Sequence, residues 1–158
     1  MRRSIPNLAS RTAAIAIVLV LFGCQPEDVQ PGLWFNGEVV VAHVSDWTFT
    51  DEIDEVFIET QTWYLVPHST TIWCATLDGV PYIGSYGDEK KRWEENVARN
   101  PNARLRILDE LYDVTISAVS DLPTVDSLNM RYSDKYDMQE VFGEDLPVWW
   151  YYRITQRD

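Results

Sequence analysis

Three consecutive basic side chains form the only run of positive charge beyond residue 24: Lys90, Lys91 and Arg92. They fall near the start of an expected helix at 88–99, where unpaired backbone N–H groups and the helix dipole attract anions. Ser85, a few residues earlier, adds a hydroxyl group that can donate to a phosphate. A solvated helix face explains the same residues, with Lys90 paired to Glu94 four positions on. The pattern therefore leaves a phosphate site and a charged surface as two interpretations.

No other pattern in the sequence matches a known catalytic motif. The two histidines, His43 and His68, belong to no cluster of the three or four ligands that a metal needs, so we predict no metal site. His68 follows Pro67 and is expected to be a polar turn residue or to contact a ligand. The chain contains no Gly-x-Ser-x-Gly, phosphate-loop or His-Glu-x-x-His motif. Catalytic residues therefore stay unassigned.

Aromatic residues are the strongest compositional signal, at 13% of the 158 residues, with seven tryptophans. Residues 149–152 are Trp-Trp-Tyr-Tyr, and a strand sends neighbouring side chains to opposite faces. One face would build the core, and the other would line a ligand cleft or a dimer surface. The formal net charge of −12 excludes a general nucleic-acid binder, because phosphates would be repelled.

The N-terminal segment resembles the signal of a bacterial lipoprotein. Basic residues precede an apolar run at 13–22, which is too short to span a bilayer and fits an export signal. The run ends in Leu-Phe-Gly-Cys, which places Cys24 where that family carries its acylated cysteine. The resemblance implies a signal peptide at 1–23 and a tether at 24–35. The protein would then be lipid-anchored to a membrane, on the periplasmic or extracellular side of the bacterial cell envelope. A soluble export signal with an incidental cysteine is the alternative.

Residues 36–158 are expected to form one domain, mainly β with two helices. Charged, amphipathic segments predict the helices at 88–99 and 124–136. Asp78-Gly79 between two apolar segments is the strongest hairpin signal, and Cys74 lies in an apolar strand where we expect burial. Strands joined by hairpins indicate an antiparallel barrel or sandwich. Alternating and β-branched segments predict about seven strands: 38–44, 46–49 with 56–60, 70–77, 80–86, 103–108, 112–118 and 147–154.

The order strand, turn, strand, helix, Asn-Pro, strand resembles the split β-barrel flavin-binding superfamily. Known members include pyridoxamine-phosphate oxidases and deazaflavin-dependent nitroreductases, and the likeness covers about 56–119. Tyr86, Lys90 and Asn100-Pro101 match the family pattern, while Ser85 stands where that pattern has a polar amide. The resemblance implies an antiparallel split β-barrel with Greek-key-like connections. It also implies a bound FMN or deazaflavin and a homodimer with the cofactor at the interface.

Two departures alter the phosphate site that the resemblance implies. Asp88 replaces a serine, and Ser69-Thr70-Thr71 stand in place of an arginine. Trp73 and Tyr82 would flank the cofactor ring. The candidate cofactor-binding residues are Thr70, Thr71, Trp73, Tyr82, Ser85, Lys90 and Lys91. Two functions remain open. One is an envelope-anchored redox protein that binds a flavin or deazaflavin, and the other is a cofactor-free lipoprotein that serves as a binding or envelope-assembly module.

Overall fold

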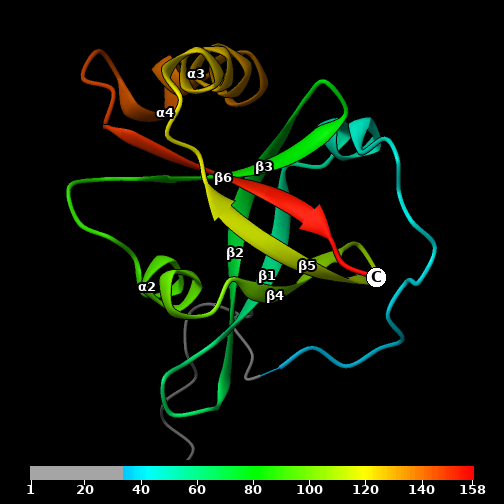
Figure 1. The fold of residues 1–158 in the computed structure, drawn as a ribbon. Coiled ribbons are helices and arrows are strands. Elements are labelled where there is room, and N and C mark those ends of the chain that lie inside the picture. The colour runs from blue at the N-terminus through cyan, green and yellow to red at the C-terminus, as the bar shows by residue number, and fades with distance from the viewer. Residues whose placement is uncertain (1–33) are drawn as a thin grey trace, which may run out of the picture.

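The computed structural model describes residues 34–158, so the expected signal peptide, Cys24 and most of the expected tether lie outside the described residues. Six antiparallel strands close into a barrel in the order β1-β2-β3-β6-β5-β4 (Figure 1). The strands are β1 (Glu55–Gln61), β2 (Pro67–Leu77), β3 (Val80–Tyr86), β4 (Asn102–Ile107), β5 (Glu110–Ala118) and β6 (Trp149–Gln156). The helices are the 3-10 helix η1 (Thr48–Glu52), α2 (Arg92–Arg99), α3 (Leu122–Tyr136) and α4 (Met138–Phe142).

The predicted hairpin between β2 and β3 is confirmed. Asp78 and Gly79 have φ values of +54° and +75°. A two-residue hairpin turn requires positive φ at both central positions, and aspartate and glycine tolerate it better than most residues. β6 then enters between β3 and β5, and the pairing of β1 with β4 closes the barrel. The mainly β, antiparallel fold expected from the sequence is therefore present.

The predicted strand at 38–44 is wrong. The segment forms only an isolated bridge between Val39 and Leu111, and Val41 is 89% exposed. Because the barrel is closed, it has no free edge with which a seventh strand could pair. The valine-rich pattern therefore reflects local preference that the barrel does not use.

The predicted strand at 46–49 is also wrong, because η1 begins at Thr48. The Asp46 carboxylate accepts the Thr48 N–H at 2.9 Å, and the Thr50 hydroxyl donates to the Trp47 carbonyl at 2.9 Å. Such local side-chain bonds compete with strand pairing. The predicted residues 56–60, in contrast, lie within β1.

Both predicted helices are present, but their starts are shifted. α2 begins at Arg92 because Lys91 is extended, and the Lys91 N–H donates to the Glu94 carboxylate at 2.7 Å. α3 begins two residues earlier than predicted, where the Asp121 side chain caps it. Asp137, at φ +42°, ends α3 and caps α4, a third α-helix of five residues that the sequence pattern did not predict. Five residues are too few to show a helical period.

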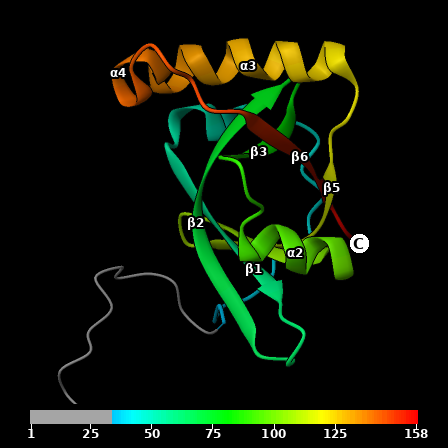
Figure 2. The same ribbon diagram turned by 90° about the vertical axis from the view of Figure 1, so that its left-hand side faces the viewer.

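Two buried apolar clusters hold the domain together. The larger cluster fills the barrel and includes Ile58 and Val114, and the smaller lies beneath α3 and includes Leu128 and Tyr132. Figure 2 shows α3 lying across one end of the barrel, with α2 toward the other end. Cys74 is 2% exposed in the barrel cluster, which confirms its predicted burial. Within residues 34–158, no helix is long and apolar enough to cross a membrane.

Candidate ligand-binding site

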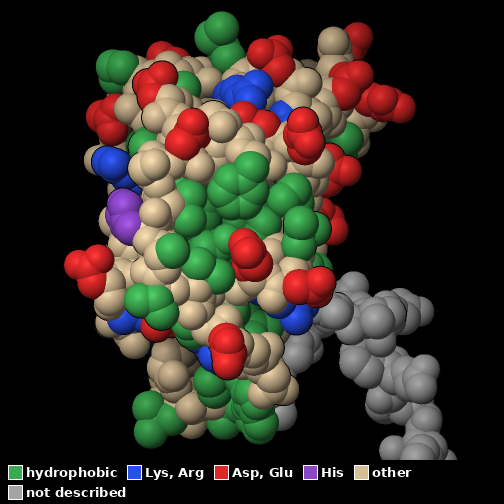
Figure 3. Space-filling model, turned by 90° about the vertical axis from the view of Figure 1, so that its right-hand side faces the viewer, with side chains coloured by type: hydrophobic (Ala, Val, Ile, Leu, Met, Phe, Trp, Pro, Cys, Tyr) green, Lys and Arg blue, Asp and Glu red, His purple; other side chains and the backbone are tan. Residues whose placement is uncertain are grey.

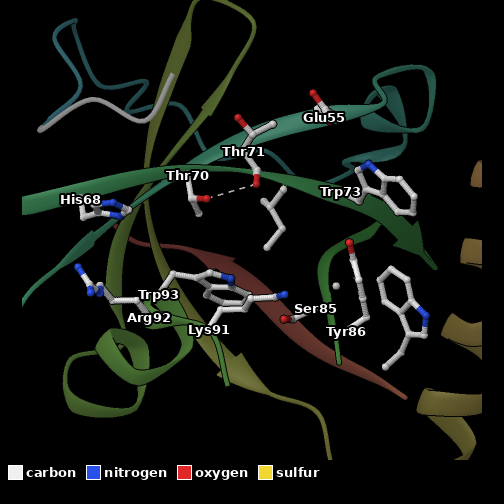
Figure 4. Close-up of a pocket in the computed structure, with 13 residues that line it drawn as sticks. Glu55, His68, Thr70, Thr71, Trp73, Ser85, Tyr86, Lys91, Arg92 and Trp93 are labelled. Atoms are coloured by element: carbon white, nitrogen blue, oxygen red, sulfur yellow. Dashed lines mark hydrogen bonds between the residues drawn. The ribbon is translucent and has the colours of Figure 1, made fainter. Parts of the chain in front are cut away.

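A cavity of about 410 Å³ opens between β2, β3, the start of β6 and the start of α2 (Figure 4). This volume lies in the range of small-molecule binding sites. The cavity gathers five of the seven residues expected to bind a cofactor: Thr70, Thr71, Trp73, Ser85 and Lys91. Residues that are up to 21 positions apart in the sequence therefore face one space.

One wall of the cavity is aromatic. The ring centroids of Trp73 and Trp149 lie 6.0 Å apart at an interplanar angle of 14°, and Tyr86 lies 5.1 Å from Trp149. Gly84 permits this arrangement, because a Cβ atom there would stand 2.9 Å from the Trp149 ring. The indole Nε1 of Trp149 is buried and has no hydrogen-bond partner among the described residues. A ligand acceptor beside this N–H would remove the cost of leaving it unpaired.

The start of α2 brings positive charge to the cavity. Lys91 and Arg92 both line it, and neither forms an ion pair with another residue of the described chain. Lys91 Nζ lies 4.9 Å from the Tyr86 ring centroid. Figure 4 shows Glu55, the acidic side chain of the lining, on the opposite edge of the cavity. The two cations are therefore available to an anionic ligand.

His68 adds a second unpaired atom to the lining. Its Nδ1 is buried and has no hydrogen-bond partner in the part of the chain that the structure describes. Figure 4 shows the imidazole ring on the same side of the cavity as Arg92. From the sequence, His68 was expected to be either a polar turn residue or a ligand contact. The structure places it on β2, where it lines the cavity.

Two of the expected cofactor-binding residues lie elsewhere. Tyr82 is 7% exposed in the cluster beneath α3, so it does not line the cavity. Lys90 Nζ lies 3.5 Å from the Trp150 ring centroid, 3.0 Å from the Tyr152 hydroxyl and 3.3 Å from the Glu94 carboxylate. The pair between residues 90 and 94 is the one that the charged-face interpretation predicts. Adjacent lysines therefore have different surroundings, and only Lys91 reaches the cavity.

Ser85 lines the cavity, but its hydroxyl hydrogen is already used. The hydroxyl donates to the Glu94 carboxylate at 3.0 Å, and the Tyr152 hydroxyl donates to the same carboxylate at 2.5 Å. Burial and the hydrogen bond to Glu94 raise the pKa of Tyr152, so its phenol stays protonated. Ser85 can accept a hydrogen bond from a ligand, but it does not provide the donor for a phosphate that the sequence suggested.

The expected cofactor-binding set left out Arg92 and Trp149, although both line the cavity. Arg92 belonged to the basic run, and Trp149 belonged to the aromatic pair at 149–150. Both signals were visible, but the direction of each side chain depends on where α2 and β6 begin. No group of three or more metal-ligating side chains occurs among the described residues.

Comparison with solved structures places the fold among split β-barrel proteins. A pyridoxamine 5'-phosphate oxidase-like protein from Listeria innocua matches with a TM-score of 0.52 at 17% identity, over 68% of this chain and 87% of that chain. A conserved hypothetical protein from Mycobacterium tuberculosis matches with a TM-score of 0.55 at 16% identity, over 78% and 85%. These likenesses and the six-stranded antiparallel barrel confirm the split β-barrel fold predicted from the sequence.

Residues 50–145 match a bacterial family described as "uncharacterized protein conserved in bacteria (DUF2255)", and the chain belongs to this family. The match spans β1 to α4, so it includes the parts of β2, β3 and α2 that line the cavity, and it ends before Trp149. No curated protein matches the chain.

Proposed function

We propose that this protein binds a planar, anionic small molecule in the cavity, and that a flavin or deazaflavin phosphate is the ligand. One observation carries the proposal: two near-parallel indole rings, of Trp73 and Trp149, line the same cavity as two cations that form no ion pair among the described residues. Aromatic rings prefer to stack on flat partners, and charge-assisted hydrogen bonds hold phosphates. The likeness to a pyridoxamine 5'-phosphate oxidase-like protein supports a phosphorylated aromatic ligand.

The residues of the cavity divide into ring-binding and phosphate-binding groups. Trp73 and Trp149, which also stack on Tyr136 and Tyr151, line the cavity and would border the ring, and Lys91 and Arg92 would hold the phosphate. The buried Nδ1 of His68 and Nε1 of Trp149 have no partner among the described residues, and they would pair with polar atoms of the ligand once the lining shifts to expose them. When bound, a flavin supplies electron transfer, which would make the protein a redox protein.

Other features favour the second candidate, a binding module without a redox cofactor. The Ser85 hydroxyl already donates its hydrogen bond to Glu94, and Tyr82 lies outside the cavity. Two groups expected to contact the flavin are therefore not available in the expected roles. The cavity would then hold another planar anion, with the same aromatic wall and the same cations.

Titration of the purified protein with FMN and with a deazaflavin phosphate separates the two candidates. The proposal predicts binding of at least one, with changes in visible absorbance. Lys91→Ala should weaken that binding about tenfold or more, because a charge-assisted bond contributes about 1.5–3 kcal/mol. Lys90→Ala is the matched control, since Lys90 lies outside the cavity, and it should leave affinity unchanged. No binding of either compound to the unsubstituted protein would overturn the flavin proposal and leave the cofactor-free module.

We also propose that Cys24 is acylated and anchors the protein to a membrane of the bacterial cell envelope. Support comes from the apolar run at 13–22 and the Leu-Phe-Gly-Cys sequence that ends it. Cys24→Ser should leave an uncleaved or soluble species, measured by mass spectrometry and by membrane fractionation. Normal processing and unchanged membrane association of this variant would contradict the anchor.

A further inference from the structure

The loop between β1 and β2 presents four consecutive apolar side chains to solvent. The residues are Trp63, Tyr64, Leu65 and Val66, and Trp63 and Leu65 are 75% and 78% exposed. Figure 2 shows this hairpin projecting from the barrel at the end opposite α3. In Figure 3, hydrophobic side chains gather at this end of the molecule. Residues 62–66 are called the β1–β2 tip below. Soluble proteins rarely expose contiguous apolar groups of this kind without a partner.

Local hydrogen bonds hold the β1–β2 tip in shape. The Thr62 hydroxyl donates to the Val66 carbonyl at 2.6 Å, and the Leu65 N–H donates to the Thr62 carbonyl at 3.1 Å. Leu65 has φ +66°, a conformation that costs a leucine about 1–2 kcal/mol. Trp63 and Tyr64 touch edge to face, with centroids 5.2 Å apart. The tip therefore keeps a strained backbone at Leu65 while its apolar side chains face solvent.

Charge is divided between the two ends of the molecule. Residues 121–146, which include α3 and α4, carry seven acidic and two basic side chains. Residues 91–106, which include α2 and most of β4, carry five basic and two acidic side chains, of which Arg104 is paired with Glu59 of β1. Arg99 of this basic segment lines a hollow together with Trp63 and Tyr64. An anionic surface would therefore attract the β1–β2 tip and repel the α3 end.

The described chain begins at the same end as the β1–β2 tip. The Phe35 N–H donates to the carboxylate of Glu59, which lies near the end of β1 that leads into the tip. Cys24 is ten residues before Trp34, and ten extended residues span at most about 33–36 Å. A lipid anchor at Cys24 therefore keeps the tip within reach of the bilayer surface.

We infer that the β1–β2 tip inserts into the interfacial layer of the membrane that carries the anchor. This inference rests on the proposed acylation of Cys24. Tryptophan and tyrosine favour the level of the lipid headgroups, and Leu65 and Val66 would enter the outer acyl region. Arg99 would lie beside anionic headgroups, and the acidic α3 end would point away from the membrane. The ligand cavity, on the flank between these two ends, would stay open to water.

A fluorescent probe on the tip tests the insertion. The full chain carries an NBD label at Leu65→Cys, or at Met130→Cys on α3 as the matched control, since Met130 is 70% exposed at the other end. The unsubstituted chain, labelled in parallel, gives the background from Cys24 and Cys74. Each protein is reconstituted with phosphatidylethanolamine–phosphatidylglycerol vesicles that contain a doxyl-labelled lipid quencher. We expect the probe at 65 to be quenched at least threefold more strongly than the probe at 130.

Vesicle flotation of the same samples keeps anchor and insertion separate. Protein that floats with vesicles while the probe at 65 stays as accessible to water as the probe at 130 overturns the insertion and leaves the anchor. Protein that does not float overturns both. Shielding of the probe at 65 without vesicles, together with a dimer in sedimentation, also overturns the inference, because a second copy would then cover the tip.

A second substitution tests whether the apolar side chains drive the insertion. Trp63→Ser in the Leu65→Cys protein should lower the inserted population about tenfold, because burial of one large apolar side chain has roughly that effect. Leu122→Ser is the control, since Leu122 is equally exposed, at 73%, but stands at the α3 end. Equal quenching of the probe in both variants would contradict insertion through the tip.

Discussion

Two groups of aromatic side chains arise from neighbouring parts of the fold but have different surroundings. The first group, called the covered group, is Tyr82, Tyr132 and Tyr151, which are 7%, 0% and 1% exposed. The Tyr132 hydroxyl lies 3.1 Å from the Trp73 carbonyl and 3.2 Å from the Tyr82 carbonyl, and the Tyr151 hydroxyl donates to Asn129. The covered group is therefore buried, and these two hydroxyl groups are paired.

The second group, called the cavity group, is Trp73, Tyr86 and Trp149. Tyr86 is 40% exposed, and the Trp149 Nε1 has no partner among the described residues. The two groups touch, since the Tyr132 and Trp149 centroids lie 5.5 Å apart. The two groups therefore differ in how far the rest of the protein covers them. α3 covers the first group, whereas α3 and α4 cover the second only in part, with Tyr136 stacked on Trp73 and Phe142 beside Trp149, and we propose that a ligand covers the remainder.

The largest expected effect is on stability, in the covered group. Tyr132→Ala should lower the free energy of unfolding by about 3–5 kcal/mol, because it opens a cavity at a fully buried position. Tyr132→Phe should cost only about 1 kcal/mol, since it removes one hydrogen bond. Urea unfolding measures both. A loss below about 1 kcal/mol for Tyr132→Ala would show that α3 does not seal this group.

Buried Cys74 gives the barrel interior a measurable pH response. Burial raises the pKa of its thiol to about 11, from 9.0. Between these values the unfolded chain loses the proton while the folded chain keeps it. Stability from this group is therefore complete below pH 9 and falls by about 2–3 kcal/mol as the pH rises to 11.

Urea unfolding of the unsubstituted protein and Cys74→Ala between pH 8 and 11 checks this slope. Lys135, whose Nζ lies 4.0 Å from the Cys74 sulfur, has a pKa lowered mainly by burial, which acts in the opposite direction. Lys135 is present in both proteins, so the difference between them reports the thiol together with its coupling to Lys135. Rapid reaction of native Cys74 with a thiol reagent at neutral pH would refute the burial itself.

Gly84 stands between the two groups and links them. A Cβ atom there would lie 2.8 Å from a Tyr132 ring atom and 2.9 Å from a Trp149 ring atom. Gly84→Ala should therefore cost about 1–3 kcal/mol of stability through overpacking. The Trp149 ring must also move, so ligand affinity should fall in the same variant. Urea unfolding and FMN titration test this prediction. Unchanged stability and unchanged FMN affinity would mean that the two rings are not closely packed around Gly84.

The smallest expected change in stability comes from Trp149→Phe. Phenylalanine keeps most of the ring contacts, so the cost should be about 1 kcal/mol or less. Loss of the indole N–H removes one bond to the ligand and should weaken its binding by up to about tenfold. Equal weakening by Tyr151→Phe, which alters a paired hydroxyl of the covered group, would remove the distinction between the groups.

Local signals predicted much of this fold. Asp78-Gly79 fixed a hairpin because the turn depends on two residues, and the strand and helix periods located most elements. The prediction of a strand at 38–44 was wrong because strand preference is local, whereas barrel closure depends on the pairing of β1 with β4. The predicted start of α2 was wrong because the Glu94 carboxylate accepts the Lys91 N–H, a contact that charge alone does not indicate.

Directions of side chains at the site were harder to predict than their positions. Tyr82 and Tyr86 share a face of β3, yet α3 covers the first and leaves the second 40% exposed. Lys90 and Lys91 are adjacent, but only one lines the cavity. Such differences depend on where α2 and α3 end against the barrel, which is a tertiary property.

The most direct test for a ligand in the cavity follows the indole N–H resonances by NMR during a titration with FMN. Trp149→Phe assigns the Trp149 resonance, and buried Trp47, which does not line the cavity, and tip residue Trp63 serve as internal references. We predict that the Trp149 N–H resonance shifts as FMN binds, while those of Trp47 and Trp63 stay unchanged. Binding of FMN with an unchanged Trp149 resonance would contradict the claim that a ligand completes the cavity group.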